Sequence, residues 1–443
     1  MRNLAVCTRA AVMGCAVLAL CACGGEGDDA GSSGPKGPSS SLFLVPSSLD
    51  ALAAEAWFDH PWPSDFRRDP DGAVHITGYY NPRSVVLIKT YLTAMAKAID
   101  GFSPVAAGYL RFTGPIEPAT LPANPSEATS SDASVQLIDV DEASPERGQR
   151  KRVTLHWRLE EGAWWRPYTL AFMPTMGFPL RPSTRYALVV TNDVTASDGS
   201  RIGVAPELRQ VLGIDAPTGA TQGLRDRWAP AVTALEQAGV DRARIVHLTV
   251  FTTSDPTKEA MLFADHARSR QPAPTVDDAW ALKEQTTEYD VYEGSFGPSP
   301  DYQRGEPPFE YVGGGFEVDA QGVPVVQREF HARFALAVPK ASTCPMPADG
   351  YPVVMYAHGT GGDYRSVLGA TGKSLALRCM AAMGVDQIMH PGRLPEGKWV
   401  PELLFFNVQN PDAMRTNIRQ SAIDEVVRAR LIRESGIDVP ASV

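Results

Sequence analysis

The stretch that decides the fold class is a short apolar run that ends in a glycine-rich turn. Tyr351-Pro352-Val353-Val354-Met355-Tyr356-Ala357 leads directly into His358-Gly359-Thr360-Gly361-Gly362. A continuous apolar run of this length is typical of a strand that is buried on both faces. The glycines let the backbone turn sharply and approach a ligand closely. Backbone N–H groups at such a turn stabilise the negative charge that develops on a carbonyl oxygen under nucleophilic attack.

The residues after this turn predict one parallel strand–helix–strand unit. Residues 366–376 are expected to form a helix, and residues 381–385 form a second apolar strand beside the first. A loop over 387–395 and a long helix over 410–432 follow, with Asp412 as a candidate N-cap of that helix. The apolar face of the long helix is expected to comprise Met414, Ile418, Ala422, Val426 and Leu431.

The preceding part of the chain has the shorter periods of a β-rich unit, which we place over residues 43–275. Helices are expected within it at 84–99, 223–239 and 258–268. Strand-like segments lie at 109–112, 135–140, 152–159, 168–173, 186–191 and 245–252. Residues 276–329 have a loop-like composition and are interpreted as a connector to the unit over 330–443.

The N-terminus indicates export. Arg2 and Arg9 supply a basic region before a short apolar segment over 10–20, which is too short for a comfortable membrane span. The following Leu20-Cys21-Ala22-Cys23 resembles a bacterial lipoprotein signal, so residues 1–22 would be removed and Cys23 would carry the lipid. An ordinary secretory peptide is the alternative. Residues 23–42, rich in Gly, Ser, Pro and Asp, are expected to form a flexible tether between the lipid-anchored terminus and the folded body.

The charge balance excludes one class of partner, and the cysteine pattern predicts one cross-link. The formal net charge is −10, with acidic and basic residues interspersed, which argues against nucleic acid as a partner.

Only Cys344 and Cys379 lie in the folded part, each shortly before one of the two apolar strands. Because neighbouring parallel strands begin at the same edge of a sheet, the two cysteines are expected to meet in a disulfide. Two free thiols are the alternative.

Taken together, these segments resemble bacterial lipase-like proteins of the virulence-factor type, the lipase N-terminal domain family. Beyond the glycine turn, the matching segments are 62–65, 177–182, 249–256, 384–387 and 406–407, together with His390 and Arg393. The resemblance implies an α/β-hydrolase lipoprotein that acts on carboxyl esters through a Ser-His-acid triad. It also implies that His358, Gly359, Thr360, Gly361 and Gly362 form the oxyanion hole.

The catalytic residues implied by this resemblance cannot be assigned. No Gly-x-Ser-x-Gly nucleophile elbow occurs, and the triad is expected beyond Val443. His390 precedes the expected serine and acid, so we interpret it as a structural loop residue. Ser366 and Ser421 lie in predicted helices without an elbow and are not candidates for the nucleophile. We expect neither a cofactor nor a metal, because the histidines show no His-x-x-x-His spacing.

Three further residues near the turn have structural interpretations. Arg393 is expected to pair with Asp386 or with a loop carbonyl, and Asp363 is a candidate cap of the following helix. A phosphate-binding loop is an alternative for the glycine turn, but the Gly-Lys-Ser/Thr ending of a P-loop is missing.

The sequence therefore predicts a β-sandwich-like N-terminal domain followed by an incomplete α/β-hydrolase domain. The corresponding function is an exported lipase- or esterase-like protein of the bacterial cell envelope, bound to the membrane by its lipid and inactive as the chain stands. Its substrate would be an ester or a lipid. The alternative is a non-catalytic envelope lipoprotein that binds a glycan, a lipid or a protein partner.

Overall fold

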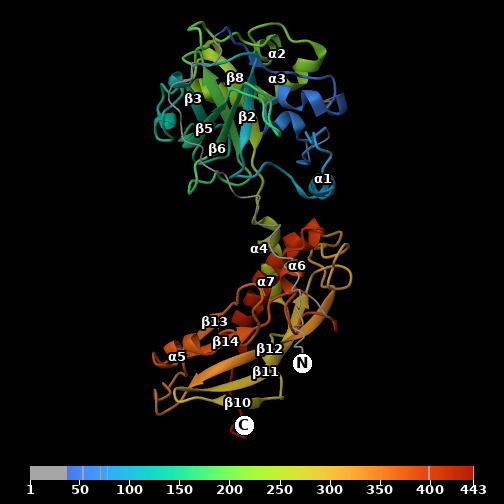
Figure 1. The fold of residues 1–443 in the computed structure, drawn as a ribbon, viewed down its shortest axis with the longest axis vertical. Coiled ribbons are helices and arrows are strands. Elements are labelled where there is room, and N and C mark those ends of the chain that lie inside the picture. Colours follow the sequence, from blue (N-terminus) through green and yellow to red (C-terminus); the bar gives the residue numbers. More distant parts are fainter. Residues whose placement is uncertain (1–36, 52–53, 70, 77, 398–399, 443) are drawn as a thin grey trace, which may run out of the picture.

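The computed structural model describes residues 37–442, except 52, 53, 70, 77, 398 and 399. The predicted signal segment 1–22 and the lipidation site Cys23 lie outside the described residues. The apolar core clusters fall into two groups that share no residue, one drawn from residues 43–251 and the other from residues 263–439. We call the parts of the chain that carry them the N-terminal lobe and the C-terminal lobe (Figure 1).

The N-terminal lobe contains two four-stranded antiparallel sheets. The first has the order β1-β2-β6-β5, with β1 (Ser41–Leu42), β2 (Gly108–Phe112), β6 (Thr169–Pro174) and β5 (Val153–Arg158). The second has the order β4-β3-β7-β8, with β4 (Arg150–Lys151), β3 (Val135–Asp139), β7 (Arg185–Thr191) and β8 (Ile245–Thr252). This part of the chain is β-rich, as the alternating and apolar segments predict.

The second sheet is buried on both faces, which explains its continuous apolar strands. Leu188 and Val190 of β7 join the core between the two sheets, whereas Ala187 and Val189 pack against helices on the other side. Those helices are α2 (Pro206–Val211) and α3 (Gly219–Gln237), and Trp228 of α3 is fully buried there. The lobe thus has three layers: sheet, sheet and helices. The peripheral helix α1 (Val86–Ala98) is mostly exposed.

The predicted tether is shorter than the sequence indicates. Ser41 and Leu42 pair with β2, and Ser39 donates a hydrogen bond from its hydroxyl to the Gly114 carbonyl over 2.8 Å. Residues 39–42 therefore belong to the folded lobe. A polar composition does not exclude a strand, because the backbone N–H and C=O groups that pair at a sheet edge do not depend on the side chain.

The C-terminal lobe is a six-stranded mixed sheet with helices on both faces. The main order is β10-β11-β12-β14-β13, and β9 (Thr275–Val276) also pairs with β11. The other strands are β10 (Ala281–Gln285), β11 (Tyr289–Asp301), β12 (Arg328–Pro339), β13 (Val353–Tyr356) and β14 (Ala381–Val385). β13 and β14 are parallel, and α5 (Ala370–Ala376) connects them. The predicted parallel strand–helix–strand unit is present.

Three helices cover the two faces of this sheet. α5 packs on one face, over Ala335 and Ala382. On the other face, α4 (Lys258–Ser269) and α7 (Pro411–Arg430) lie over Leu336 and Met383. The short helix α6 (Pro401–Phe406) precedes α7. Because α4 packs with α7, the cores divide the chain between β8 and α4 rather than after residue 275.

The predicted connector is wrong in its first half. Residues 276–329 include β10 and the 13-residue strand β11, which pairs with β12 along most of its length. The run Gly294-Ser295-Phe296-Gly297-Pro298 has the composition of a loop although it lies in a strand. A Cβ added at Gly294 would lie 2.9 Å from the ring of Phe334, so a larger residue does not fit there. Close packing across the sheet thus accounts for a residue type that indicates a loop in the sequence.

Candidate functional site

The glycine turn lies at the carboxyl end of β13, between that strand and α5. Gly361 has a φ of +85°, a backbone conformation that L-residues with side chains rarely adopt. A Cβ added there would lie 2.7 Å from Oε1 of Glu402 on α6. Both the backbone conformation and the neighbouring carboxylate therefore favour glycine at this position.

The turn has fewer available donors than the sequence predicts. The Gly361 N–H donates to Nε2 of His390 over 3.1 Å, and the Gly362 N–H donates to the Gly359 carbonyl over 3.0 Å. The N–H groups of Gly359 and Thr360 have no hydrogen-bond partner within the described part of the chain, and both residues are exposed. An incoming oxyanion would therefore meet these two donors.

Two buried histidines hold the turn in place. His358 accepts the Gln387 N–H at Nε2 over 3.0 Å and donates from Nδ1 to the Gly359 carbonyl over 2.8 Å. His390 accepts at Nε2 from Gly361 and donates from Nδ1 to the Ile388 carbonyl over 2.8 Å. Burial, more than any other influence, lowers the pKa of His390. Both ring nitrogens of each histidine are engaged with backbone, so these contacts give His390 a structural position.

Two charged residues near the turn have partners that differ from the expected ones. Arg393 pairs with Asp424 of α7 over 2.7 Å, and its guanidinium lies 3.6 Å from the centroid of the Phe330 ring. The expected pairing of Arg393 with Asp386 is wrong. Asp386 instead pairs with Arg333 and accepts the Tyr364 N–H over 3.1 Å. Asp424 lies 31 residues from Arg393 along the chain, so the pairing depends on how α7 packs and has no local sequence signal.

The serines near the turn lack an activating base. The Ser366 hydroxyl accepts the Asp363 N–H over 2.9 Å and is itself bonded to the Asp363 carboxylate over 3.3 Å. Asp363 thus closes this local turn and does not cap α5, which begins seven residues later. The Ser421 hydroxyl is buried and has no hydrogen-bond partner in the described residues.

A Ser–His hydrogen bond does exist in the N-terminal lobe. The Ser64 hydroxyl lies 2.8 Å from Nε2 of His60, whose Nδ1 faces the Leu44 carbonyl at 2.8 Å. Both side chains are fully buried, so no substrate reaches them. Ser64 also accepts the Phe66 N–H and caps a short helical turn, which gives the pair a structural role.

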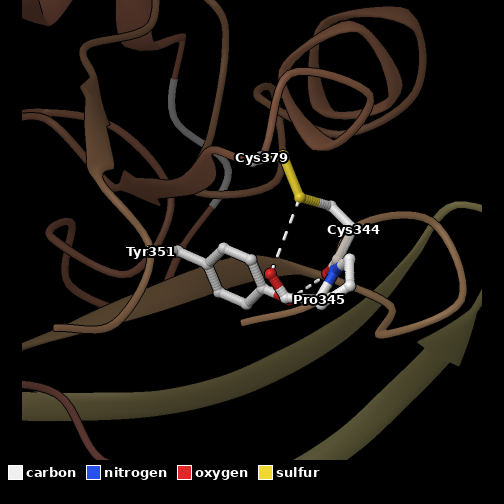
Figure 2. Close-up of a disulfide and its surroundings, with 4 residues drawn as sticks. All are labelled: Cys344, Pro345, Tyr351 and Cys379. Carbon is white, nitrogen blue, oxygen red and sulfur yellow. Dashed lines mark hydrogen bonds between the residues drawn. A yellow bond between two sulfur atoms is a disulfide. The ribbon is translucent and has the colours of Figure 1, made fainter. Parts of the chain in front are cut away.

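Cys344 and Cys379, the pair for which the sequence predicts a disulfide, are joined by one in the structure (Figure 2). Their Cα atoms are 5.6 Å apart. The Tyr351 hydroxyl donates to the Cys344 carbonyl over 2.6 Å. Cys344 and Tyr351 both precede β13, and Cys379 lies just before β14. The disulfide therefore joins the segment before β13 to the start of β14.

The long helix α7 buries a polar face, which sequence periodicity did not reveal. Its N-cap is Asn410, whose side chain accepts the Ala413 N–H, and not Asp412. Ile418, expected on the buried face, is 56% exposed. The buried positions are instead mostly polar: Thr416, Asn417, Gln420, Arg428 and Arg430. The available signal was the polar residues at 416, 420, 424 and 428, one helical turn apart.

Arg428 connects this polar face to the strands of the candidate site. Its Nη1 donates to the Tyr356 carbonyl over 3.1 Å and to the Met383 carbonyl over 2.9 Å, and its Nη2 pairs with Glu425. Tyr356 is the last residue of β13, two residues before the turn. The guanidinium therefore links the end of β13, from which the turn starts, to the middle of β14.

A large cavity lies elsewhere. It has a volume of about 680 Å³ between α1, α4 and α7, and none of residues 358–362 lines it. In the described residues no group of His, Cys, Asp or Glu side chains has the arrangement of a metal site. No described helix is long and apolar enough to cross a membrane.

Comparisons with known proteins add no assignment. No family model and no curated protein matches the chain. Among solved structures, the N-terminal part of the bacterial S-layer protein SbsC has 10% sequence identity and a TM-score of 0.17, over 53% of this chain and 38% of that one. A second structure of the same S-layer protein has 7% identity and a TM-score of 0.17, over 58% and 36% of the two chains. The chain thus covers well under half of those structures, and similarity this low carries no argument about fold or function.

Proposed function

We propose that this chain carries the oxyanion loop of an exported serine carboxylester hydrolase, and that the chain as it stands does not turn over esters. The observation that carries the proposal is that Gly359 and Thr360, two exposed residues at the carboxyl end of a parallel strand, have N–H groups without a hydrogen-bond partner in the described residues. Backbone N–H donors near the carbonyl under attack stabilise the tetrahedral intermediate of ester hydrolysis.

The surrounding sheet supports an α/β-hydrolase arrangement. Strands β11 and β12 are antiparallel, β14 returns antiparallel to β12, and β13 lies parallel to β14 at the edge of the sheet. Helices cover both faces, as expected for a sheet that continues through parallel strands. Ligands of open α/β sheets bind outside the carboxyl ends of such strands, which is where the turn lies.

The contacts of two described serines support the proposed lack of turnover. The Ser366 hydroxyl is bonded to a carboxylate without a histidine, and Ser64, which does have a histidine, is fully buried. A nucleophilic serine needs both a base and access to substrate. Export through a signal over 1–22 with lipid attachment at Cys23 belongs to the same proposal and is supported by the sequence pattern alone.

The test compares two lengths of the protein with p-nitrophenyl butyrate as substrate. The gene is sequenced past the codon for Val443, and the given chain and any longer reading frame are expressed. We expect only the buffer rate from the given chain. A longer frame is expected to contain Gly-x-Ser-x-Gly and to hydrolyse the ester.

Within the longer protein, Thr360→Pro removes one of the two N–H donors, and Thr360→Ala retains it. We expect Thr360→Pro to lower kcat by about 10²–10³-fold, whereas Thr360→Ala stays close to the unmodified enzyme. Enzyme-like turnover by the given chain, or equal rates for the two variants, would contradict the proposal.

A further inference from the structure

A second candidate site lies in the N-terminal lobe, far along the chain from the glycine turn. It is a cavity of about 210 Å³ whose lining side chains are all aromatic except Ala107. Trp57 and Phe58 lie at its buried side, whereas Tyr79 and Trp164 are 41% and 39% exposed. An aromatic cluster in a protein core has its rings covered on all sides. Here two exposed rings border the cavity, whose volume is small for a ligand pocket and suits an occupant of about one ring.

Segments distant in sequence bring these rings together. Trp57 and Phe58 lie in the short helix η3 (Ala54–Asp59), and Tyr79 and Trp164 come from loops before α1 and between β5 and β6. The ring centroids of Trp57 and Tyr79 are 5.2 Å apart, and those of Phe58 and Tyr109 are 4.8 Å apart. These distances are in the range of favourable aromatic contacts, so the walls support one another.

The backbone fixes the floor of this pocket. Trp62 and Tyr109 form a two-way bridge, in which the Trp62 N–H donates over 3.1 Å and the Tyr109 N–H donates over 2.6 Å. Gly108 is required for this approach, because an added Cβ would lie 2.5 Å from the Trp62 carbonyl oxygen. The pocket is therefore preformed by the sheet edge and does not depend on mobile side chains alone.

The charges around the pocket oppose a cationic ligand. No lining residue is charged, so no carboxylate offers a counter-ion. The buried guanidinium of Arg67 already lies 3.8 Å from the centroid of the Trp57 ring, and Arg166 lies 5.1 Å from that of Tyr80. Arg67 forms no ion pair with a carboxylate in the described part of the molecule. Arg166 is paired with Glu161 over 2.7 Å, so the charge that a second cation between these rings would meet is that of Arg67.

The polar groups that remain are suited to hydroxyl-bearing ligands. The Tyr109 hydroxyl donates to the Trp57 carbonyl over 3.3 Å, but the hydroxyls of Tyr79 and Tyr80 have no partner in the described residues. Aromatic faces are electron-rich and attract the C–H edge of a saturated ring, whereas free phenol hydroxyls bind hydroxyl groups. We propose that this pocket binds one pyranose ring of a neutral sugar. The proposal is independent of ester hydrolysis, because the pocket belongs to the other lobe.

The test is ligand-observed NMR of the full chain with methyl glycosides of glucose, galactose, mannose and N-acetylglucosamine, and with tetramethylammonium as the cationic probe. We expect saturable binding of at least one glycoside and none of tetramethylammonium. Trp164→Ala removes an exposed wall and is expected to weaken that binding by about fivefold to tenfold, which is the value of one aromatic contact.

Phe178→Ala is the matched control, since Phe178 is an aromatic residue of the same lobe, 50% exposed and outside the pocket lining. It should leave the affinity unchanged, and circular dichroism establishes that both variants are folded. Failure of every glycoside to bind, preference for tetramethylammonium, or equal affinity of Trp164→Ala and the unmodified protein would each overturn the proposal.

Discussion

At the residue scale, buried neutral histidines determine how the N-terminal lobe responds to acid. His247 is fully buried in β8, where Nε2 donates to the Arg111 carbonyl over 3.0 Å and Nδ1 accepts the Leu248 N–H over 3.0 Å. Burial lowers its pKa to about 4, against an ordinary value of 6.5. Burial likewise lowers the pKa of His60, which is also fully buried. The folded lobe therefore favours uncharged histidines.

This preference predicts a loss of stability in acid. Below pH 6.5 His247 binds a proton in the unfolded chain but not in the folded lobe. The stabilisation that comes from keeping this histidine neutral is therefore complete above pH 6.5 and is lost as the pH falls toward 4. The pKa difference corresponds to about 3 kcal/mol of unfolding free energy. The free energy of unfolding of His247→Asn, measured in urea, should fall less between pH 7 and pH 4 than that of the unmodified protein. His331→Asn, at an exposed histidine of the C-terminal lobe that bonds to Asp277, is the control for histidine replacement outside the N-terminal lobe. Equal losses of unfolding free energy in all three proteins would refute the expectation.

At the element scale, α7 is held to the sheet by polar contacts as well as by apolar ones. We expect Arg428→Met to destabilise the C-terminal lobe by about 3 kcal/mol, because it removes the cationic partner of Glu425, which keeps only its hydrogen bond from Gln387, and the hydrogen bonds to the Tyr356 and Met383 carbonyls. Arg433→Met, at an exposed position just after α7, should change the unfolding free energy by less than about 0.5 kcal/mol. Chemical denaturation measures both, and similar values for the two variants would show that the contacts of Arg428 contribute little.

The same helix shows where sequence patterns were informative and where they were not. Periodicity located α7, β13, β14 and most strands of the N-terminal lobe, because each contains a helical, alternating or continuous apolar pattern that is readable within a few residues. It misplaced the buried face of α7, since Gln420 and Arg428 are buried through hydrogen bonds to distant loops and strands. The sequence also identified the glycine turn, but it gave no sign that His390 accepts a hydrogen bond from the Gly361 N–H. Partners separated by tens of residues leave no local signal.

At the scale of the whole molecule, the two lobes have separate cores, and only the C-terminal lobe contains the disulfide. We therefore expect two unfolding transitions in denaturant. Cys344 and Cys379 are separated by 35 residues, and a cross-link over a loop of this length stabilises a fold by about 4 kcal/mol through the entropy of the unfolded chain. Reduction should shift the transition of the C-terminal lobe to lower denaturant concentration and leave the other in place.

Intrinsic tryptophan fluorescence during urea unfolding reports mainly on the N-terminal lobe, because six of the eight tryptophans lie there, whereas Trp280 packs against Phe334 in the C-terminal lobe. Circular dichroism reports on both lobes. In a double variant, Cys344→Ala with Cys379→Ala, the C-terminal lobe should unfold without reductant at the denaturant concentration at which the reduced protein unfolds. Adding reductant should not shift that transition further. If reduction instead moved a single transition common to both signals, the contacts between the lobes, such as that of the Tyr91 hydroxyl with Met414 Sδ at 3.3 Å, would have to couple the two cores into one cooperative unit.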